Sequence, residues 1–186
     1  NVPVSMIAPS HGVIWRDNPL QIVETYKEWA QQKPSKKAVI LFDTMWNATR
    51  KMADAISEGL GEGGVPSRVF HMPTSDRNDV ITEIFKAGAV LVGASTINSG
   101  VLPTIAPILE DLKGLKFRNK IGAAFGSYGW SGESPQQIAD ILTEMKVELV
   151  AEPLKVKYVP HGDDLKRCIS LGRSVARKLK EVAKRG

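Results

Sequence analysis

From residue 38 to the end of the chain, short apolar runs alternate with stretches whose apolar residues recur at helical spacing. The runs predict five strands, at 38–44, 67–72, 89–95, 120–127 and 147–159. The stretches between them predict helices at 49–60 and 78–86, helices that open at Pro103 and Pro135, and a terminal helix at 163–184. The run 89–95 has no polar residue until its end, which is typical of a strand buried on both faces. We therefore expect an α/β fold with an open five-stranded parallel sheet, strand order 2-1-3-4-5, and helices on both faces.

The first 37 residues do not belong to this alternation. VPVSMIAPSHGVIWR predicts a strand that runs into a loop, and Asp17, Asn18 and Pro19 then start a helix. QQKPSKK resembles a linker. We expect residues 1–37 to be the tail of a preceding domain and residues 38–186 to form the α/β domain. The chain does not begin with methionine, and we expect it to be a fragment of a longer protein.

Composition agrees with a globular domain in a reducing compartment. The chain has 186 residues, of which 42% are hydrophobic and 24% charged. Its one cysteine, Cys168, excludes an internal disulfide and fits the cytoplasm, and we expect this residue in or near the core. No apolar run is long enough to span a bilayer, and the N-terminal segment lacks the pattern of a secretory signal.

The net charge of +5 is concentrated in the last predicted helix. The residues concerned are Lys166, Arg167, Arg173, Arg177, Lys178, Lys180, Lys184 and Arg185. They form either an ordinary solvated face or a surface that attracts an acidic partner. No aromatic residues are interleaved with these charges and no nucleic-acid-binding motif is present, so we do not expect a nucleic acid as the partner.

Three loops should meet at one edge of the sheet, because they follow strands one, three and four. They read TMWNAT (44–49), STINSG (95–100) and SYGWSGE (127–133). Ligands of open parallel sheets bind beyond the carboxyl ends of the strands. The first loop opens a helix whose free N–H groups can hold a phosphate, with Asn47 in a left-handed conformation. Hydroxyl, amide and indole groups together predict a phosphorylated ligand with a flat aromatic ring.

These loops resemble those of one family. TMWNAT follows the flavodoxin phosphate-loop pattern Thr-x-Thr-Gly-x-Thr, with Trp46 and Asn47 at the second Thr and the Gly. DTMW, ASTINSGVLP and KIGAAFGSYGWSGE resemble the flavodoxin-like domain of flavodiiron proteins, also called A-type flavoproteins or rubredoxin:oxygen oxidoreductases. APSHGVIWR resembles the closing segment of the metallo-β-lactamase-like di-iron domain that precedes it in that family. The resemblance implies a flavodoxin-like fold for residues 38–186.

The resemblance also implies FMN as the cofactor and assigns residues to it. Thr44 and Thr49 would hold the phosphate with the N–H groups of Met45, Trp46, Asn47 and Ala48. The ring would be lined by Ser95, Thr96, Ile97 and Asn98. Its edge would meet backbone groups of Ser127, Tyr128, Gly129, Trp130, Ser131 and Gly132, and Trp130 would also stack on it. The alternatives are hydroxyls that only cap a helix, a Trp130 that packs on a neighbour, a Trp46 that anchors its loop or meets another subunit, and an ordinary turn at 131–133.

Histidines point to no metal site within this chain. His11, in APSHG, matches the histidine that closes the di-iron site of the family, so it would be a metal ligand only in a full-length parent. The other ligands of that site are absent from this sequence, and we expect no iron in this chain. His71 and His161 lie at strand ends without metal-ligand spacing, and we interpret them as ordinary polar residues.

The function implied by the resemblance is that of the FMN electron-transfer domain of a flavodiiron oxygen or nitric oxide reductase. This oxidoreductase would pass electrons from a rubredoxin-like protein or reduced deazaflavin to a di-iron site, and the parent would be a homodimer or a dimer of dimers. The alternative is a free-standing flavodoxin-type electron carrier or a flavin reductase. A phosphorylatable receiver module is excluded, because it needs an aspartate at the end of strand three, where this chain has Gly93-Ala94-Ser95.

Overall fold

A computed structural model describes residues 3–33 and 35–184. Its central sheet is parallel and contains β1 (Ala38–Asp43), β2 (Ser67–His71), β3 (Ala89–Ala94), β6 (Ile121–Tyr128), β7 (Glu148–Leu149) and β8 (Leu154–Lys157). The strand order is β2-β1-β3-β6-β7, and β8 also pairs with β6. Since β7 and β8 together occupy the place of the predicted fifth strand, the expected order 2-1-3-4-5 is confirmed.

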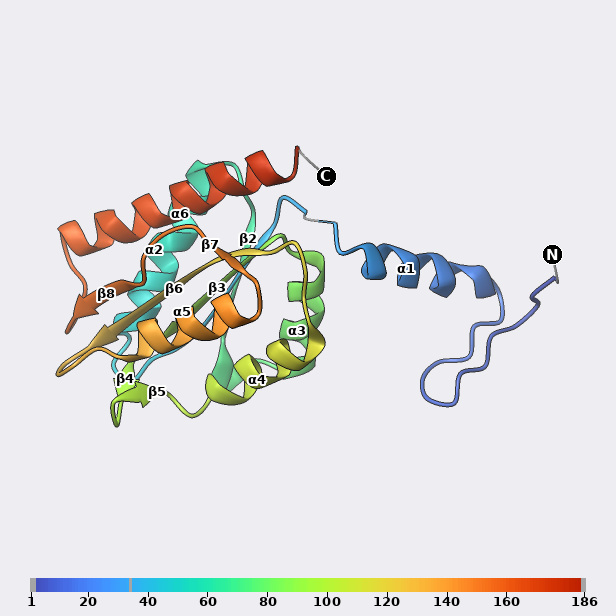
Figure 1. The fold of residues 1–186 in the computed structure, drawn as a ribbon, viewed down its shortest axis with the longest axis horizontal. Helices are drawn as coiled ribbons and strands as arrows, with labels where there is room; N and C mark the ends of the chain where they lie inside the picture. The colour runs from blue at the N-terminus through green and yellow to red at the C-terminus, as the bar shows by residue number, and fades with distance from the viewer. Residues whose placement is uncertain (1–2, 34, 185–186) are drawn as a thin grey trace.

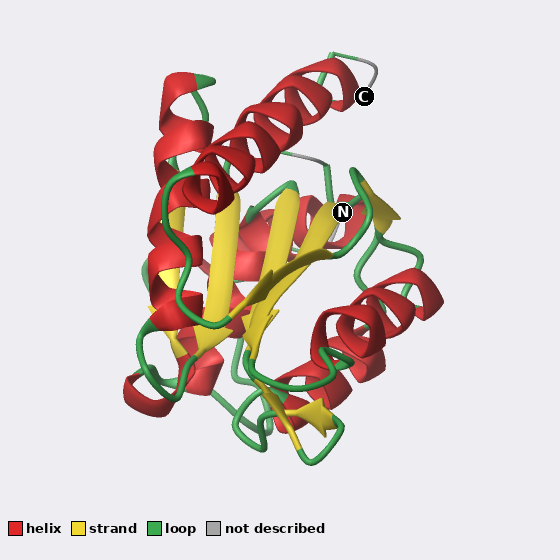
Figure 2. Ribbon diagram, turned by 90° about the vertical axis from the view of Figure 1, so that its left-hand side faces the viewer, coloured by secondary structure: helices red, strands yellow, loops and turns green. Residues whose placement is uncertain are grey.

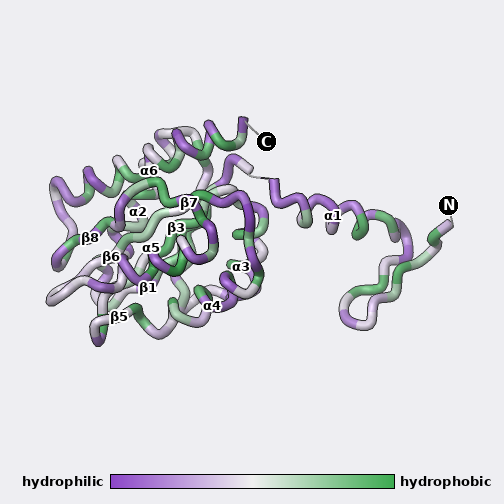
Figure 3. Tube along the Cα trace, in the orientation of Figure 1, coloured by the Kyte–Doolittle hydropathy of each residue, from purple (hydrophilic) through white to green (hydrophobic). Residues whose placement is uncertain are grey.

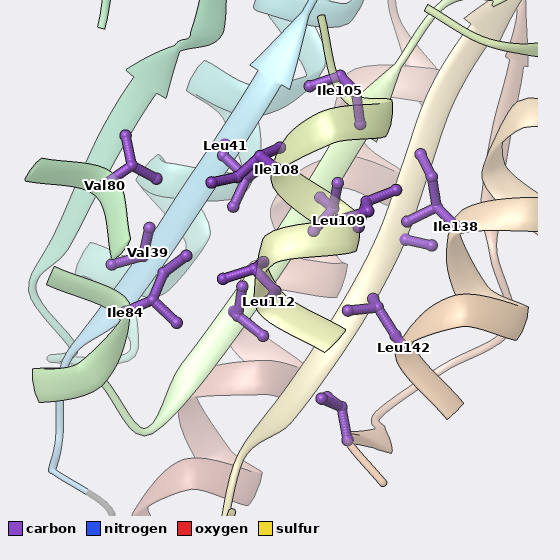
Figure 4. Close-up of a cluster of buried hydrophobic side chains, with 14 of the residues drawn as sticks. Val39, Leu41, Val80, Ile84, Ile105, Ile108, Leu109, Leu112, Ile138 and Leu142 are labelled. Carbon is purple, nitrogen blue, oxygen red and sulfur yellow. The ribbon is translucent and has the colours of Figure 1, made fainter. Parts of the chain in front are cut away.

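Helices cover both faces of this sheet (Figures 1 and 2). One face carries α2 (Ala48–Glu62) and α6 (Asp163–Val182). The other carries α3 (Arg77–Lys86), α4 (Ala106–Leu115) and α5 (Ser134–Glu144), whose apolar residues pack with those of β1 and β3 (Figure 4). The hydropathy of the chain follows this layering, with apolar segments concentrated in the central strands (Figure 3). β1 and β3 are buried at every position, as the uninterrupted apolar runs predict.

Local signals of the sequence explain several helix ends. Asn47 precedes α2 with φ 59°, the left-handed conformation expected for it. The carboxylate of Asp76 caps α3 by accepting hydrogen bonds from the backbone nitrogens of Asn78 and Asp79. A short 3₁₀ helix, η1 (Met72–Thr74), lies between β2 and α3.

Three expectations about element boundaries are wrong. The predicted strand 147–159 is interrupted at residues 150–153, where Pro153 has no N–H group to donate to a neighbouring strand. The helix expected at Pro103 begins only at Ala106, which keeps Pro107 within the first turn, where its missing N–H is tolerated. The segment predicted as the loop STINSG contributes to a two-stranded hairpin of β4 (Thr96–Ile97) and β5 (Gly100–Val101). The hydrophobic pattern of the sequence did not predict these two short strands.

The N-terminal segment projects from the sheet-containing body (Figure 1). The expected strand there is reduced to one antiparallel bridge between Ile7 and Trp15. Helix α1 (Pro19–Gln31) starts next to Asn18 as predicted, but it has no buried residue, and its Tyr26 and Trp29 are exposed. No helix in the described part of the chain is long and apolar enough to cross a membrane.

Candidate functional site

The turn between β1 and α2 presents unused backbone donors. The backbone of Asn47 has a left-handed conformation, which turns the chain from residues 44–46 directly into α2. Within the described residues, the N–H groups of Met45, Trp46, Asn47 and Ala48 donate to no protein acceptor. The nitrogen of Thr49 is bonded to Oγ1 of Thr44 at 3.3 Å. Four free donors at a helix N-terminus form a seat for an anion.

The carboxylate of Asp43 holds the start of this turn. Its Oδ1 accepts a hydrogen bond of 2.6 Å from the backbone nitrogen of Thr44 and lies 3.4 Å from Nε2 of His71. Its Oδ2 accepts a hydrogen bond from the hydroxyl of Thr104. Asp43 therefore connects the ends of β1 and β2 with the segment that leads into α4. The ring of His71 stacks on that of Phe42, so this histidine packs against β1 beside the turn.

Three buried hydroxyl groups lie directly behind the turn. Oγ1 of Thr49 is 3.0 Å from Oγ of Ser95 and 3.0 Å from Oγ of Ser127, and the two serine oxygens are 3.1 Å apart. We call these three residues the hydroxyl triangle. Thr49 is fully buried and the two serines nearly so. Each member comes from a different one of the three predicted loops.

A cavity of about 360 Å³ opens beside the turn at the carboxyl edge of the sheet. It is lined by Met45, Trp46, Ala48, Ser95, Ser127, Tyr128, Gly129, Tyr158 and Val159. Seven of these nine residues belong to the predicted site. The walls are mainly apolar and aromatic, which suits a flat ring, and the turn with the free N–H groups contributes Met45, Trp46 and Ala48 to the lining.

The remaining predicted residues lie around this cavity without lining it. Thr96 and Ile97 form β4, where Oγ1 of Thr96 accepts a hydrogen bond from the nitrogen of Ser134. Asn98 is left-handed at the tip of the hairpin. Trp130 is the most exposed large apolar residue described, at 95%, and Trp46 is 84% exposed.

The loop that carries Trp130 contains one side-chain hydrogen bond and one glycine that its conformation requires. The hydroxyl of Ser131 donates to Glu133 at 2.7 Å. Gly132 has φ +80°, and a Cβ there would lie 3.0 Å from the ring of Tyr128, so a side chain would meet both backbone strain and crowding.

Tyr158 and Val159 are the lining residues that sequence reasoning missed. Tyr158 adopts φ 63°, and its ring lies 3.6 Å from the position of a Cβ on Gly129. The ammonium group of Lys157 lies 5.2 Å from the centre of that ring. The sequence predicted that both residues lie at the end of a long strand. The one available signal for a role in ligand binding was an aromatic residue, Tyr158, at the carboxyl end of that strand.

The charges of α6 lie mostly away from this cavity. The helix begins just after Val159 and runs toward the opposite end of the sheet, where Lys180 lies near Gly64, beyond the end of α2 (Figure 1). Four of its cations are paired: Lys166 with Asp163, Arg167 with Asp164, Arg173 with Glu62 and Lys178 with Glu148. Arg185 lies outside the described residues. These pairs involve four of the seven basic residues of the predicted cluster that the structure describes.

Two buried titratable groups lie outside the site. Lys120 precedes β6 at the amino edge of the sheet, and its Nζ donates to the carbonyl oxygens of Phe85 at 3.1 Å and Ala87 at 2.5 Å. Burial lowers the pKa of Lys120 to about 8. Burial likewise raises the pKa of the Cys168 thiol to about 11, in agreement with the core position expected for it.

His11, which the resemblance makes an iron ligand in a full-length parent, lies far in the sequence from the residues of the cavity. His11 is exposed in the loop between Ile7 and Trp15. Within residues 3–33 and 35–184, no group of three or more His, Cys, Asp or Glu side chains is close enough to hold one metal ion. The described residues therefore do not by themselves fit a di-iron centre.

Comparison with known proteins identifies the class to which this fold and cavity belong. Residues 40–172 match the flavodoxin family, and the chain belongs to that family. It is 49% identical to the nitric oxide reductase of Moorella thermoacetica over 96% of this chain and 45% of that protein. The structure superposes with a TM-score of 0.91 on rubredoxin oxygen:oxidoreductase from Desulfovibrio gigas, at 42% identity and over 96% and 45% of the two chains. The TM-score with the flavodiiron protein of Giardia intestinalis is 0.89, at 25% identity and over 99% and 46%.

These findings confirm the predicted flavodoxin-like fold and the resemblance to flavodiiron oxidoreductases. The chain spans less than half the length of these relatives. Flavodoxin domains bind FMN, which confirms the predicted cofactor. The site fits this group, because four free N–H donors adjoin a cavity with apolar and aromatic walls.

Proposed function

We propose that this chain is the FMN-binding electron-transfer part of a larger flavodiiron reductase of oxygen or nitric oxide. Residues 38–186 would be the flavodoxin-like domain, and residues 1–37 the end of a preceding metallo-β-lactamase-like domain with its linker. The observation that carries the proposal is the turn with four free N–H groups beside an aromatic-walled cavity. Similarity to the reductases over 96% of the chain, N-terminal segment included, favours this function over a free-standing electron carrier or flavin reductase.

The residues of the site have separate tasks in this proposal. Thr44 and the N–H groups of residues 45–48 form the phosphate seat, and Thr49, whose buried hydroxyl faces Ser95 and Ser127, supports the seat from behind. The ring is received between the loop at 95–98 and the backbone of 127–132, with Trp130 closing over it. Tyr158 extends the aromatic wall. When bound, FMN supplies the redox chemistry, and the protein's part is to bind and orient it and to shield its ring from water.

The partners belong to the proposal as well. The electron donor would be a rubredoxin-like protein or a reduced deazaflavin, and the acceptor a di-iron site in the missing domain, for which His11 would be a ligand. The parent protein would be a homodimer or a dimer of dimers. An acidic donor would be attracted by the basic residues of α6 that form no ion pair within residues 3–33 and 35–184, and the rate at which it reduces the flavin should then fall with ionic strength. A rate that does not depend on salt would exclude electrostatic docking of the donor.

The test of the cofactor assignment is direct. The purified chain, freed of any bound flavin, should take up added FMN with the visible absorbance of a flavoprotein and quenched flavin fluorescence. The bound flavin should accept electrons from a chemical reductant and return them to an acceptor. A chain that is folded by circular dichroism and still takes up no FMN would contradict the proposed function.

A further inference from the structure

The three loops of the cofactor site are joined at one point. The hydroxyl triangle takes Thr49 from the first turn of α2, Ser95 from the loop after β3 and Ser127 from the end of β6. The residues are separated by 32 to 78 positions in the sequence, so only the folded sheet brings them together. Behind the triangle, the hydroxyl of Ser134 contacts the carbonyl oxygen of Ala94 at 3.4 Å, which adds the start of α5.

The triangle is complete as a set of hydrogen bonds. Three hydroxyl groups carry three protons, and the triangle has three edges, so one proton is available for each edge. No buried side-chain nitrogen or oxygen in the described chain lacks a partner. A closed group of this kind holds its members at fixed distances, because breaking an edge leaves one buried O–H group without an acceptor.

Thr49 connects the triangle to the phosphate seat. Its backbone nitrogen donates to Oγ1 of Thr44, while its own hydroxyl faces Ser95 and Ser127. Thr49 is fully buried and does not line the cavity, whereas both serines do. Its side chain is thus placed to act on the loops rather than on the ring of a ligand.

Resting on the proposed FMN function, we propose that the hydroxyl triangle sets the spacing between the phosphate seat and the two ring loops. Thr49, Ser95 and Ser127 are then positioning residues. A ligand with two ends gains from binding both only if the two subsites are held at the matching separation. The triangle should therefore contribute to the affinity for FMN, which has both ends, and little to the affinity for either end alone.

The experiment uses three probes on the flavin-free chain: FMN, riboflavin, which lacks the phosphate, and inorganic phosphate. Affinities for the flavins follow from fluorescence quenching, and phosphate binding follows from its competition with FMN. In Thr49→Val, which keeps the side-chain shape and removes the hydroxyl, FMN should bind about tenfold more weakly or worse. Riboflavin and phosphate should each bind within about twofold of their original affinity, because each engages one subsite only. Thr49→Ser, which keeps the hydroxyl, should retain FMN affinity.

A matched control is available elsewhere on α2. The hydroxyls of Ser57 and Ser67 are 2.8 Å apart and join α2 to β2, and neither residue lines the cavity. Ser57→Ala removes a comparable hydroxyl contact and should leave all three affinities unchanged. Should Thr49→Val fail to fold, Ser127→Ala provides the same test: FMN should again be weakened about tenfold, while riboflavin and phosphate each change by less than about twofold.

The outcomes separate the inference from the function on which it rests. Equal losses for FMN and phosphate in Thr49→Val would make Thr49 a phosphate ligand and would overturn the positioning role. Unchanged FMN affinity in a folded Thr49→Val or Ser127→Ala variant would also overturn it. An unmodified chain that binds no FMN would instead contradict the proposed function.

Discussion

The backbone nitrogen of Tyr158 donates a 2.7 Å hydrogen bond to the carbonyl oxygen of Tyr128. This bond extends the pairing of β8 with β6 by one step beyond the strand and brings the Tyr158 ring to the cavity wall. The left-handed backbone of Tyr158 is uncommon for a bulky residue. The chain thus places an exposed aromatic ring at the candidate site at a conformational cost.

Tyr158→Ala should weaken FMN binding by about 1 kcal/mol, because an aromatic side chain is removed from the wall that receives the ring. Tyr158→Phe should bind FMN nearly as well as the original chain. Fluorescence titration measures both affinities. Tyr26→Ala is the control, since Tyr26 is similarly exposed, but on α1. An equal effect of Tyr26→Ala and Tyr158→Ala would remove Tyr158 from the site.

Trp130→Ala should weaken FMN binding by about 1 kcal/mol or more if the indole closes over the ring. The free energy of unfolding of the flavin-free chain should change by less than about 0.5 kcal/mol, because the side chain is almost fully exposed. Titration with FMN and urea denaturation give the two quantities. Trp29→Ala, on α1, serves as the control. Affinity that survives Trp130→Ala would favour the alternative of a tryptophan that contacts a neighbouring protein.

Thr104→Val should lower the free energy of unfolding by about 2 kcal/mol, since it removes a hydrogen bond to the buried carboxylate of Asp43. FMN binding should also weaken, because Asp43 holds the first residue of the phosphate turn. Denaturation and titration measure the two effects. Thr25→Val removes a hydroxyl bond on the surface of α1 and should do neither. A Thr104→Val variant as stable as Thr25→Val would show that the Asp43 contact contributes nothing.

Lys120 should make stability rise with pH between about 8 and 9. Burial lowers the pKa of Lys120 in the folded chain from its ordinary 10.5 to about 8, so the unfolded chain binds this proton more tightly. The contribution is therefore fully present above pH 10.5 and is lost as the pH falls through about 8. The free energy of unfolding should increase by about 1 kcal/mol across this unit of pH.

The check is denaturation at several pH values for the original chain and for Lys120→Met, in which that increase should be absent. Cys168 limits the usable range. Its pKa is raised from 9.0 to about 11, so its contribution is present below pH 9 and is lost as the pH rises through 11. The same slope in both proteins between pH 8 and 9 would mean that Lys120 is not the source.

Much of the fold was predictable because its signals are local. Buried parallel strands need uninterrupted apolar residues, and β1 and β3 have them. Asn47 tolerates a left-handed backbone better than most residues, which marked the turn before α2. The break in the fifth strand was not predictable from periodicity, since β7 and β8 pair with separate parts of β6 and the residues between them remain partly apolar.

The sequence by itself determined the α/β order, the three loops and the turn that can seat a phosphate, because each depends on residues that are neighbours in the chain. Tertiary structure alone decided that Tyr158 lines the cavity and that Thr49, Ser95 and Ser127 share one hydroxyl triangle. Those relationships depend on which strands lie side by side and in what register. Register is set by packing across the whole sheet, which no short stretch of sequence specifies.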